Sequence, residues 1–131
     1  MASGFTTATR NQILNTNFDT ADIFGACCDA DPSDAGTAAA EISASYSYTR
    51  MTITCGSAAA GDITNSAALE FPAAVGGDWG TIGWLAIAST TVEADGSFYA
   101  SGELTTSKLI ESGDQLVFAA GAITISIAAQ A

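Results

Sequence analysis

The stretch Gly76–Ser89, GGDWGTIGWLAIAS, decides the fold of this 131-residue chain. Two glycines open it and allow a turn, and the apolar run that follows has the length of a strand rather than of a helix. Such a run, with glycines before it and threonines after it, is typical of a strand that is buried on both faces. We therefore expect residues 82–87 to form the central strand of the core, with Trp84 and Ile87 in opposite layers.

Further strand-like segments lie on both sides of this one. In residues 45–54, SYSYTRMTIT, two kinds of side chain alternate, which predicts a strand with one buried face. The other predicted strands are residues 22–28, 63–72, 97–109 and 116–127. Six or more strands, separated by turns at fairly even spacing, predict an all-β chain folded as a β-sandwich or a jelly-roll-like barrel.

The N-terminal residues 1–20 are polar and hold only a few apolar side chains. Ile13, Leu14 and Phe18 would share one face of a helix because their spacing follows the helical period. The pattern predicts either a short helix over residues 9–18 or an extended arm.

This segment sets the predicted domain organisation. Together with Phe5, its apolar residues are too few to form a second core and too many for a tail that makes no contacts. We expect an arm, residues 1–20, that orders mainly against a partner subunit, followed by one β-sandwich domain, residues 21–131.

The charge of the chain excludes several classes of partner. Three basic and 14 acidic residues give a formal net charge of -11. Arg10, Arg50 and Lys108 lie too far apart in the sequence to form a stripe that neutralises phosphates, so we expect no nucleic-acid partner. An acidic membrane surface would repel the chain, and no run of residues approaches transmembrane length. The N-terminus lacks the apolar core of a signal peptide, so synthesis in a reducing cytoplasm is expected.

The sequence shows no pattern for a metal or a cofactor, and we expect neither. Cys27, Cys28 and Cys55 form no CxxC pair and histidine is absent, which excludes the usual zinc sites. We expect these thiols to fill the core, with a bridge from Cys55 to one of the others left open. The acidic turn 29–36, DADPSDAG, is superficially like the start of a calcium loop, but Asp34 stands where the loop requires glycine.

Catalytic groups are equally scarce. Without histidine, neither a Ser–His nor a Cys–His pair can form within one chain. Glu70 and Glu103 are the first carboxylates to examine for glycoside hydrolysis, which needs no histidine. We expect that the chain is not an enzyme.

Arg50 and several aromatic residues are candidates for the core or for an interface. We expect Arg50, within the strand 45–54, to pair with an acidic neighbour across the sheet, and an ion pair between subunits is the alternative. Tyr46, Tyr48 and Trp79 would form the stacking platform of a carbohydrate-binding module if they were exposed, but aromatic residues of a sandwich more often lie in the core or at an interface. The candidate core or interface residues are Leu14, Phe18, Arg50, Trp79, Trp84 and Ile87.

Several segments, taken in order, resemble a family of small structural proteins of tailed phages. They are ADPSDAG (30–36), SYSYTR (45–50), ITNSAALEFPAA (63–74), DWGTIGWLAI (78–87) and SFYASGELTTSKLIESGDQLVFAAGAITISI (97–127). The resemblance covers about residues 22–127. The chain departs from the family in its more polar N-terminal NQILNTNF and in residues 83–88, and both departures concern contacts at edges rather than the core.

The resemblance implies a structural protein of the virion, made in the host cytoplasm. The first interpretation is a capsid decoration, or cement, protein: a homotrimer that binds the major capsid protein and stabilises the assembled head through many weak contacts. The alternative is a tail or tail-fibre component that contacts the host or other tail proteins. A free carbohydrate-binding module is a third possibility.

Overall fold

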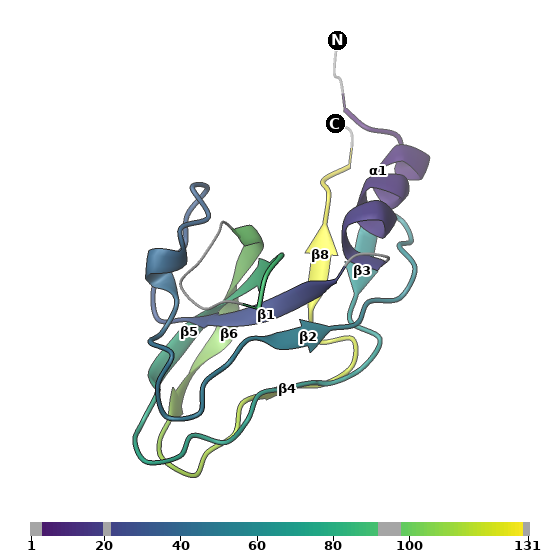
Figure 1. Cartoon of the computed structure of the whole chain (residues 1–131). Helices are drawn as coiled ribbons and strands as arrows, with labels where there is room; N and C mark the ends of the chain where they lie inside the picture. Colours follow the sequence, from purple (N-terminus) through teal and green to yellow (C-terminus); the bar gives the residue numbers. More distant parts are fainter. Residues whose placement is uncertain (1–3, 20–21, 92–97, 130–131) are drawn as a thin grey trace. The chain divides into compact units, whose positions relative to one another are not determined.

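The computed structural model describes residues 4–19, 22–91 and 98–129. Within these residues one short α-helix precedes several antiparallel sheets, which do not close into a barrel (Figure 1). The predicted β-rich class with an N-terminal helix is therefore confirmed. The elements, in chain order, are α1 (Thr7–Leu14), the π-helix η1 (Asn15–Asp19), β1 (Ile23–Cys28), the 3-10 helix η2 (Ala38–Ala40), β2 (Met51–Ile53), β3 (Asp62–Thr64), β4 (Leu69–Glu70), β5 (Gly80–Ala88), β6 (Phe98–Ile110), β7 (Val117–Phe118) and β8 (Thr124–Ser126).

Contacts within the chain divide it into two compact units, which are described separately. The helix unit comprises Met1–Asp22, Ile53–Ala68 and Phe118–Ala131, and the sheet unit comprises Ile23–Thr52 and Leu69–Val117. The predicted division into an arm and one sandwich domain stays a prediction.

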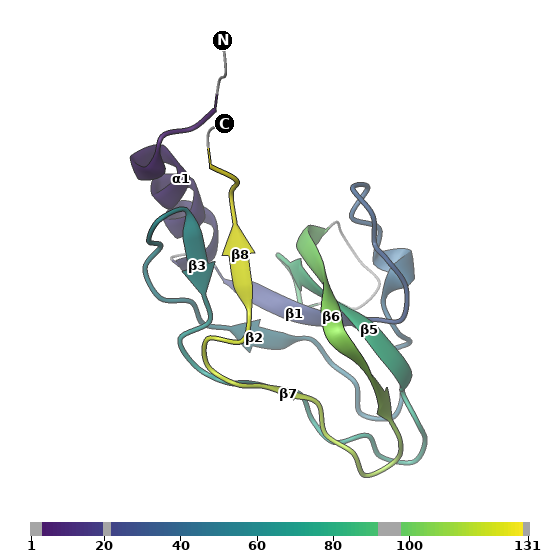
Figure 2. The ribbon, with the colours of Figure 1, turned by 180° about the vertical axis from the view of Figure 1, so that it is seen from behind.

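Strand β5 is the central strand of the sheet unit. The sheet has four strands in the order β2-β1-β5-β6, and β5 pairs with an antiparallel neighbour on each side (Figures 1 and 2). Trp84 lies opposite Cys28 of β1 and opposite Glu103 of β6. The predicted central strand is confirmed, and so is the predicted first strand, residues 22–28, which is β1.

The two faces of β5 differ in how completely they are covered. Because successive side chains alternate, Trp84 and Ala86 share one face, whereas Leu85 and Ile87 share the other. On the first face, Trp84 packs against a buried cluster of Ala26, Cys28, Ala40, Ala86, Ala88 and Phe98. Ile87 is 3% exposed, but Trp84 is only half-buried. The predicted opposite faces are confirmed, and the expected full burial of Trp84 is wrong, because its side chain lines an open pocket.

The strand predicted for residues 45–54 is wrong over its first half. Tyr46 and Ser47 have φ angles of 54° and 69°, which are outside the range of a strand. The carbonyl oxygen of Tyr46 accepts hydrogen bonds from the backbone N–H of Val75, at 3.1 Å, and from Nε1 of Trp79, at 3.0 Å. These bonds hold a turn, and β2 begins only after it.

The predicted strands 63–72 and 116–127 are each interrupted. The first contains β3 and β4, and the second contains β7 and β8. In the helix unit, Asn65 follows β3 directly. Its side chain is 2% exposed and binds the backbone of the segment between β7 and β8. Its amide nitrogen donates to the carbonyl of Ala119 at 2.9 Å, and its oxygen accepts from the N–H of Ile123 at 2.9 Å. Strand β6, in contrast, runs without interruption from Phe98 to Ile110, so the predicted strand 97–109 is confirmed.

Helix α1 lies beside β3 in the helix unit (Figures 1 and 2). The hydroxyl of Thr6 caps the helix by accepting the N–H of Thr9 at 3.3 Å. Leu14 is 1% exposed and Phe18 is 9% exposed, whereas Phe5 is 54% exposed. The chain itself therefore buries Leu14 and Phe18, and these two residues need no partner subunit to order them.

Arg10 fastens α1 to backbone of the helix unit. Its Nη1 donates to the carbonyl of Ile127 at 3.0 Å, and its Nη2 donates to the hydroxyl of Thr7 at 2.9 Å. On the same helix, Oδ1 of Asn11 accepts the N–H of Gly61 at 2.8 Å. Gly61 has a φ of 86°, and a side chain there would collide with the Arg10 guanidinium. The positive φ and the close approach of the Arg10 guanidinium therefore both favour a glycine at position 61.

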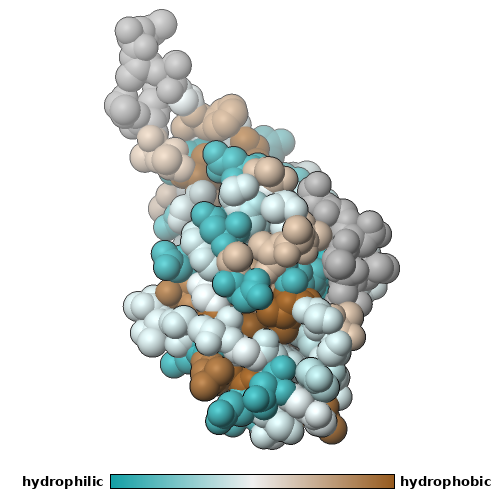
Figure 3. Space-filling view, turned by 90° about the vertical axis from the view of Figure 1, so that its left-hand side faces the viewer, coloured by the Kyte–Doolittle hydropathy of each residue, from teal (hydrophilic) through white to brown (hydrophobic). Residues whose placement is uncertain are grey.

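Exposed large apolar side chains are spread over several elements. In the described part of the chain they are Phe5, Tyr46, Val75, Tyr99, Leu109 and Val117. On the side shown in Figure 3, the hydrophobic areas are small and polar surface separates them. None of the described helices is long and apolar enough to span a membrane.

Candidate functional site

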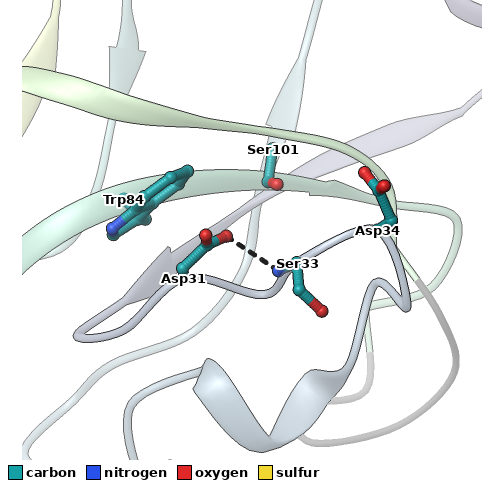
Figure 4. Close-up of a pocket in the computed structure, with 5 residues that line it drawn as sticks. All are labelled: Asp31, Ser33, Asp34, Trp84 and Ser101. Atoms are coloured by element: carbon teal, nitrogen blue, oxygen red, sulfur yellow. Dashed lines mark hydrogen bonds between the residues drawn. The ribbon is translucent and has the colours of Figure 1, made fainter.

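A shallow, open pocket lies in the sheet unit, between the loop 29–36 and the four-stranded sheet. It has a volume of about 440 Å³ and is lined by Asp31, Ser33, Asp34, Trp84 and Ser101 (Figure 4). Pockets that hold small molecules have volumes of about 300–1,000 Å³. The pocket is therefore large enough for a small ligand.

Short-range hydrogen bonds set the shape of this loop. Oδ1 of Asp31 accepts the N–H of Ser33 at 2.8 Å, and Ser33 has a φ of 59°. Gly36, with a φ of 58°, accepts the N–H of Phe98 on its carbonyl at 3.0 Å. A Cβ at Gly36 would lie only 2.9 Å from the carbonyl oxygen of Phe98. Glycine therefore allows the loop to approach the start of β6 closely.

Strands β5 and β6 supply the other wall of the pocket. Ser101 lies opposite Ala86 in the β5–β6 ladder, so it shares the face of the sheet that carries Trp84. Figure 4 shows the indole of Trp84 beside the Asp31 carboxylate at one end of the pocket and Asp34 at the other, with Ser101 between them. The hydroxyl of Ser33, in contrast, takes part in a hydrogen bond within the loop, because it accepts the N–H of Ala35 at 3.3 Å.

The pocket therefore offers an aromatic face, two carboxylates and a hydroxyl, and none of its lining residues is basic. Carboxylates accept hydrogen bonds, and a hydroxyl can donate as well as accept. Among the described residues, no group of three or more histidine, cysteine, aspartate or glutamate side chains could hold a metal ion. The pocket suits a ligand that donates hydrogen bonds and presents an apolar face.

A buried polar network lies elsewhere in the same unit. Nη2 and Nε of Arg50 donate to the two carboxylate oxygens of Glu41 at 2.6 and 2.9 Å, and Nη1 donates to the carbonyl of Thr90 at 2.8 Å. The hydroxyl of Tyr48 donates to Glu41 at 2.7 Å and accepts the N–H of Cys27 at 2.9 Å. The predicted pairing of Arg50 with an acidic neighbour is confirmed, and its partner belongs to the same chain.

All three cysteines are buried and free. Burial raises the pKa of Cys28 to about 12, with a further contribution from the charge of Glu41. Burial also raises the pKa of Cys27 and, less strongly, that of Cys55. Because the thiolate is the reactive form, these thiols are unreactive at neutral pH and serve as core side chains, as predicted.

The predicted stacking platform of Tyr46, Tyr48 and Trp79 does not form. Tyr48 is 5% exposed and Trp79 is 8% exposed, and their rings meet edge to face with centroids 5.3 Å apart. Both rings also pack against Phe71, which is fully buried. The platform is wrong because two of its three members lie in the core, the alternative that the sequence left open.

Five of the six candidate residues are buried within the chain. Arg50, Trp79 and Ile87 are buried in the sheet unit, and Leu14 and Phe18 are buried in the helix unit. Trp84 is the candidate that reaches a pocket.

Sequence reasoning misses the other four lining residues. The signal for Asp31, Ser33 and Asp34 is the acidic turn 29–36, whose pattern predicts a turn and no ligand; Ser101 carries no signal of its own. Glu70 and Glu103, the carboxylates considered for hydrolysis, lie on β4 and β6 and do not line the pocket.

The fold and its buried polar network define a small β-rich structural domain. Residues 4–126 match the family model described as "Podophage GP4 fiber I protein gp80". Because this match spans nearly the whole chain, the chain belongs to that family and is a structural protein of the phage virion. The predicted phage family is confirmed. No curated protein matches the chain.

Proposed function

We propose that this chain is a component of a phage tail fibre, where it contacts the host or other tail proteins. The supporting observation is the match of residues 4–126 to a family described by a podophage fibre protein. This match favours the fibre interpretation over capsid decoration, which the sequence resemblance placed first. A fibre component is one of many parts of a large assembly, so its contacts rather than its chemistry define its work.

The proposed role is mechanical rather than catalytic, without a cofactor. The chain contains no histidine, and its thiols are buried with raised pKa values. Arg50 and Glu41, which the fold buries, neutralise each other, and the buried guanidinium of Arg10 donates to the backbone carbonyl of Ile127. Such groups stabilise a fold and leave little with which to activate a substrate.

The proposal includes self-association as a homotrimer, which is one of the closed symmetric forms that soluble homo-oligomers adopt. Arg10 and Arg50 are buried and already hydrogen-bonded within the chain, which leaves Lys108 as the basic residue on the surface. Exposed apolar residues on β6, Tyr99 and Leu109, would supply contacts between subunits more readily than ion pairs. Neither a nucleic acid nor a membrane is a proposed partner.

Copy number tests this proposal. Quantitative mass spectrometry of purified virions, with the major capsid protein as the internal reference, counts the copies of this chain per particle. A fibre component should be present in on the order of a dozen copies, whereas a decoration protein that covers the head should be present in on the order of hundreds. Hundreds of copies would favour decoration, and absence from the particle would overturn both interpretations.

A further inference from the structure

Trp84 exposes an aromatic surface to the pocket, and packing against the sheet holds its side chain in place. The side chain packs against the buried cluster that contains Ala86 and Phe98, and the residue as a whole is half-buried. Its indole also lines the pocket, next to Asp31 (Figure 4). A large ring that loses little freedom on binding is an effective platform for a flat, apolar ligand face.

The carboxylates are placed to accept hydrogen bonds around this ring. Asp31 is held in position because its Oδ1 accepts the N–H of Ser33 at 2.8 Å, and a carboxylate has lone pairs for more than one donor. Asp34 lies at the other end of the pocket and the hydroxyl of Ser101 lies between them (Figure 4). Hydrogen bonds to an ionised acceptor are stronger than those between neutral groups. A ligand with several hydroxyl groups next to an apolar face fits this arrangement.

Charge narrows the class of ligand further. Two carboxylates and no basic residue line the pocket, and the chain carries a net charge of -11, so an anionic ligand is repelled. A quaternary ammonium ligand would tolerate the carboxylates, but such ligands are usually held by cages of several aromatic rings, and Trp84 is the aromatic residue in this lining. A neutral polyol is therefore favoured.

We propose that the pocket of Asp31, Ser33, Asp34, Trp84 and Ser101 binds one neutral pyranose residue of a glycan, with the apolar face of the sugar on Trp84 and its hydroxyls donating to Asp31 and Asp34. This inference rests on the proposed fibre function in one respect only, namely that the glycan belongs to the surface of the host. The binding itself is a property of the purified chain. Failure to bind sugar would leave the location in the virion to be decided separately by copy number.

The two tryptophans allow a direct test by NMR. In a ¹⁵N-labelled chain, the indole N–H of Trp84 reports on the pocket, and that of Trp79 is an internal reference because it is buried and donates to the carbonyl of Tyr46 at 3.0 Å. The probes are the methyl glycosides of glucose, galactose, mannose and N-acetylglucosamine. At least one should shift the Trp84 signal saturably at millimolar concentration and leave the Trp79 signal in place.

Variants of the pocket residues test whether the sugar binds in the pocket or only weakly and non-specifically elsewhere on the surface. Trp84→Ala should abolish binding, measured by saturation transfer to the sugar protons. Asp31→Asn, which keeps the Oδ1 that accepts from Ser33, and Asp34→Asn should each weaken binding about tenfold. The control, Asp62→Asn, changes an exposed carboxylate outside the pocket and should bind like the original chain. The two asparagine variants keep the test valid if Trp84→Ala fails to fold.

Three results would overturn the inference. The first is that none of the four glycosides moves the Trp84 signal. The second is that the signals of Trp84 and Trp79 move together. The third is that tetramethylammonium or methyl glucuronide binds while the neutral sugars do not.

Discussion

The guanidinium of Arg50 and the carboxylate of Glu41 form an ion pair with 2.6 Å between Nη2 and Oε2, and neither side chain has any exposed surface. Such a pair is costly to break on one side only, because the remaining charge stays buried without compensation. The Arg50 guanidinium also lies over the ring of Phe98, 5.5 Å from its centroid. The pair therefore ties the end of β1, where Glu41 bridges Cys28, to the chain that leads into β2.

Removing one member of this pair should be more harmful than removing both. Arg50→Met should lower the free energy of unfolding by about 3–5 kcal/mol, whereas the double variant Arg50→Met with Glu41→Leu should lose clearly less. Urea denaturation of the three chains measures the difference. Glu103→Gln, on an exposed position of β6, is the control and should change stability by less than about 0.5 kcal/mol. An Arg50→Met chain as stable as the original would contradict a buried, paired arginine.

Trp84 and Ile87 should differ in what they contribute to stability. Ile87 is 3% exposed, so Ile87→Ala should cost about 2–5 kcal/mol. Trp84 is half-buried, and Trp84→Ala should cost roughly 2 kcal/mol, about half of the roughly 3–5 kcal/mol expected for a fully buried ring. Thermal and chemical denaturation compare the two. A larger loss for Trp84→Ala than for Ile87→Ala would mean that the tryptophan belongs to the core and not to the wall of a pocket.

Stability should fall in alkaline solution. The folded state raises the pKa of Cys28 from 9.0 to about 12, chiefly through burial, so the unfolded chain releases this proton first. The resulting stability is fully present below pH 9 and is lost as the pH rises towards 12, at about 1.4 kcal/mol per pH unit for each such group. Cys28→Ala should therefore flatten the decline between pH 9 and pH 11 by about that slope, measured by urea denaturation at each pH. An unchanged slope would show that Cys28 is not buried as a thiol.

Substitutions of Leu14 and Phe5 should have different effects on stability, because Leu14 lies in the packed part of the N-terminal segment and Phe5 lies in its exposed part. Leu14 is 1% exposed and Phe5 is 54% exposed in the single chain. Leu14→Ala should cost about 2–5 kcal/mol, and Phe5→Ala should cost less than about 0.5 kcal/mol. The sequence alone predicts that removal of residues 1–15 leaves the fold intact; the bonds of Arg10 and the burial of Leu14 predict instead that the deletion destabilises the helix unit. If Leu14→Ala proves harmless in the isolated chain but weakens its assembly, the arm interpretation would be correct after all.

The central strand could be predicted from the sequence because local rules decide it. Glycines before residues 82–87 and an unbroken apolar run identify β5 without knowledge of any partner. The same holds for β1, since a short apolar run before an acidic turn indicates it. For the N-terminal segment the apolar spacing left a helix over residues 9–18 and an extended arm as alternatives, and the structure has the helix α1.

The failures of prediction occur where distant backbone decides the local conformation. The turn at Tyr46 depends on bonds from Val75 and Trp79, and neither Tyr46 nor Ser47 is a residue that commonly adopts a positive φ. The pocket depends on the contact of Gly36 with Phe98, which brings an acidic turn against Trp84. No local pattern in the sequence contains these contacts.

The location of the chain on the virion tests the central claim most directly. All three native cysteines are buried, so Ser112→Cys, at an exposed turn, would give this chain one accessible thiol. Phage carrying this variant can be reacted with maleimide-linked gold and viewed by electron microscopy, with unmodified phage as the control for thiols of other proteins. The fibre proposal predicts additional gold at the tail. Additional gold distributed over the head would contradict it.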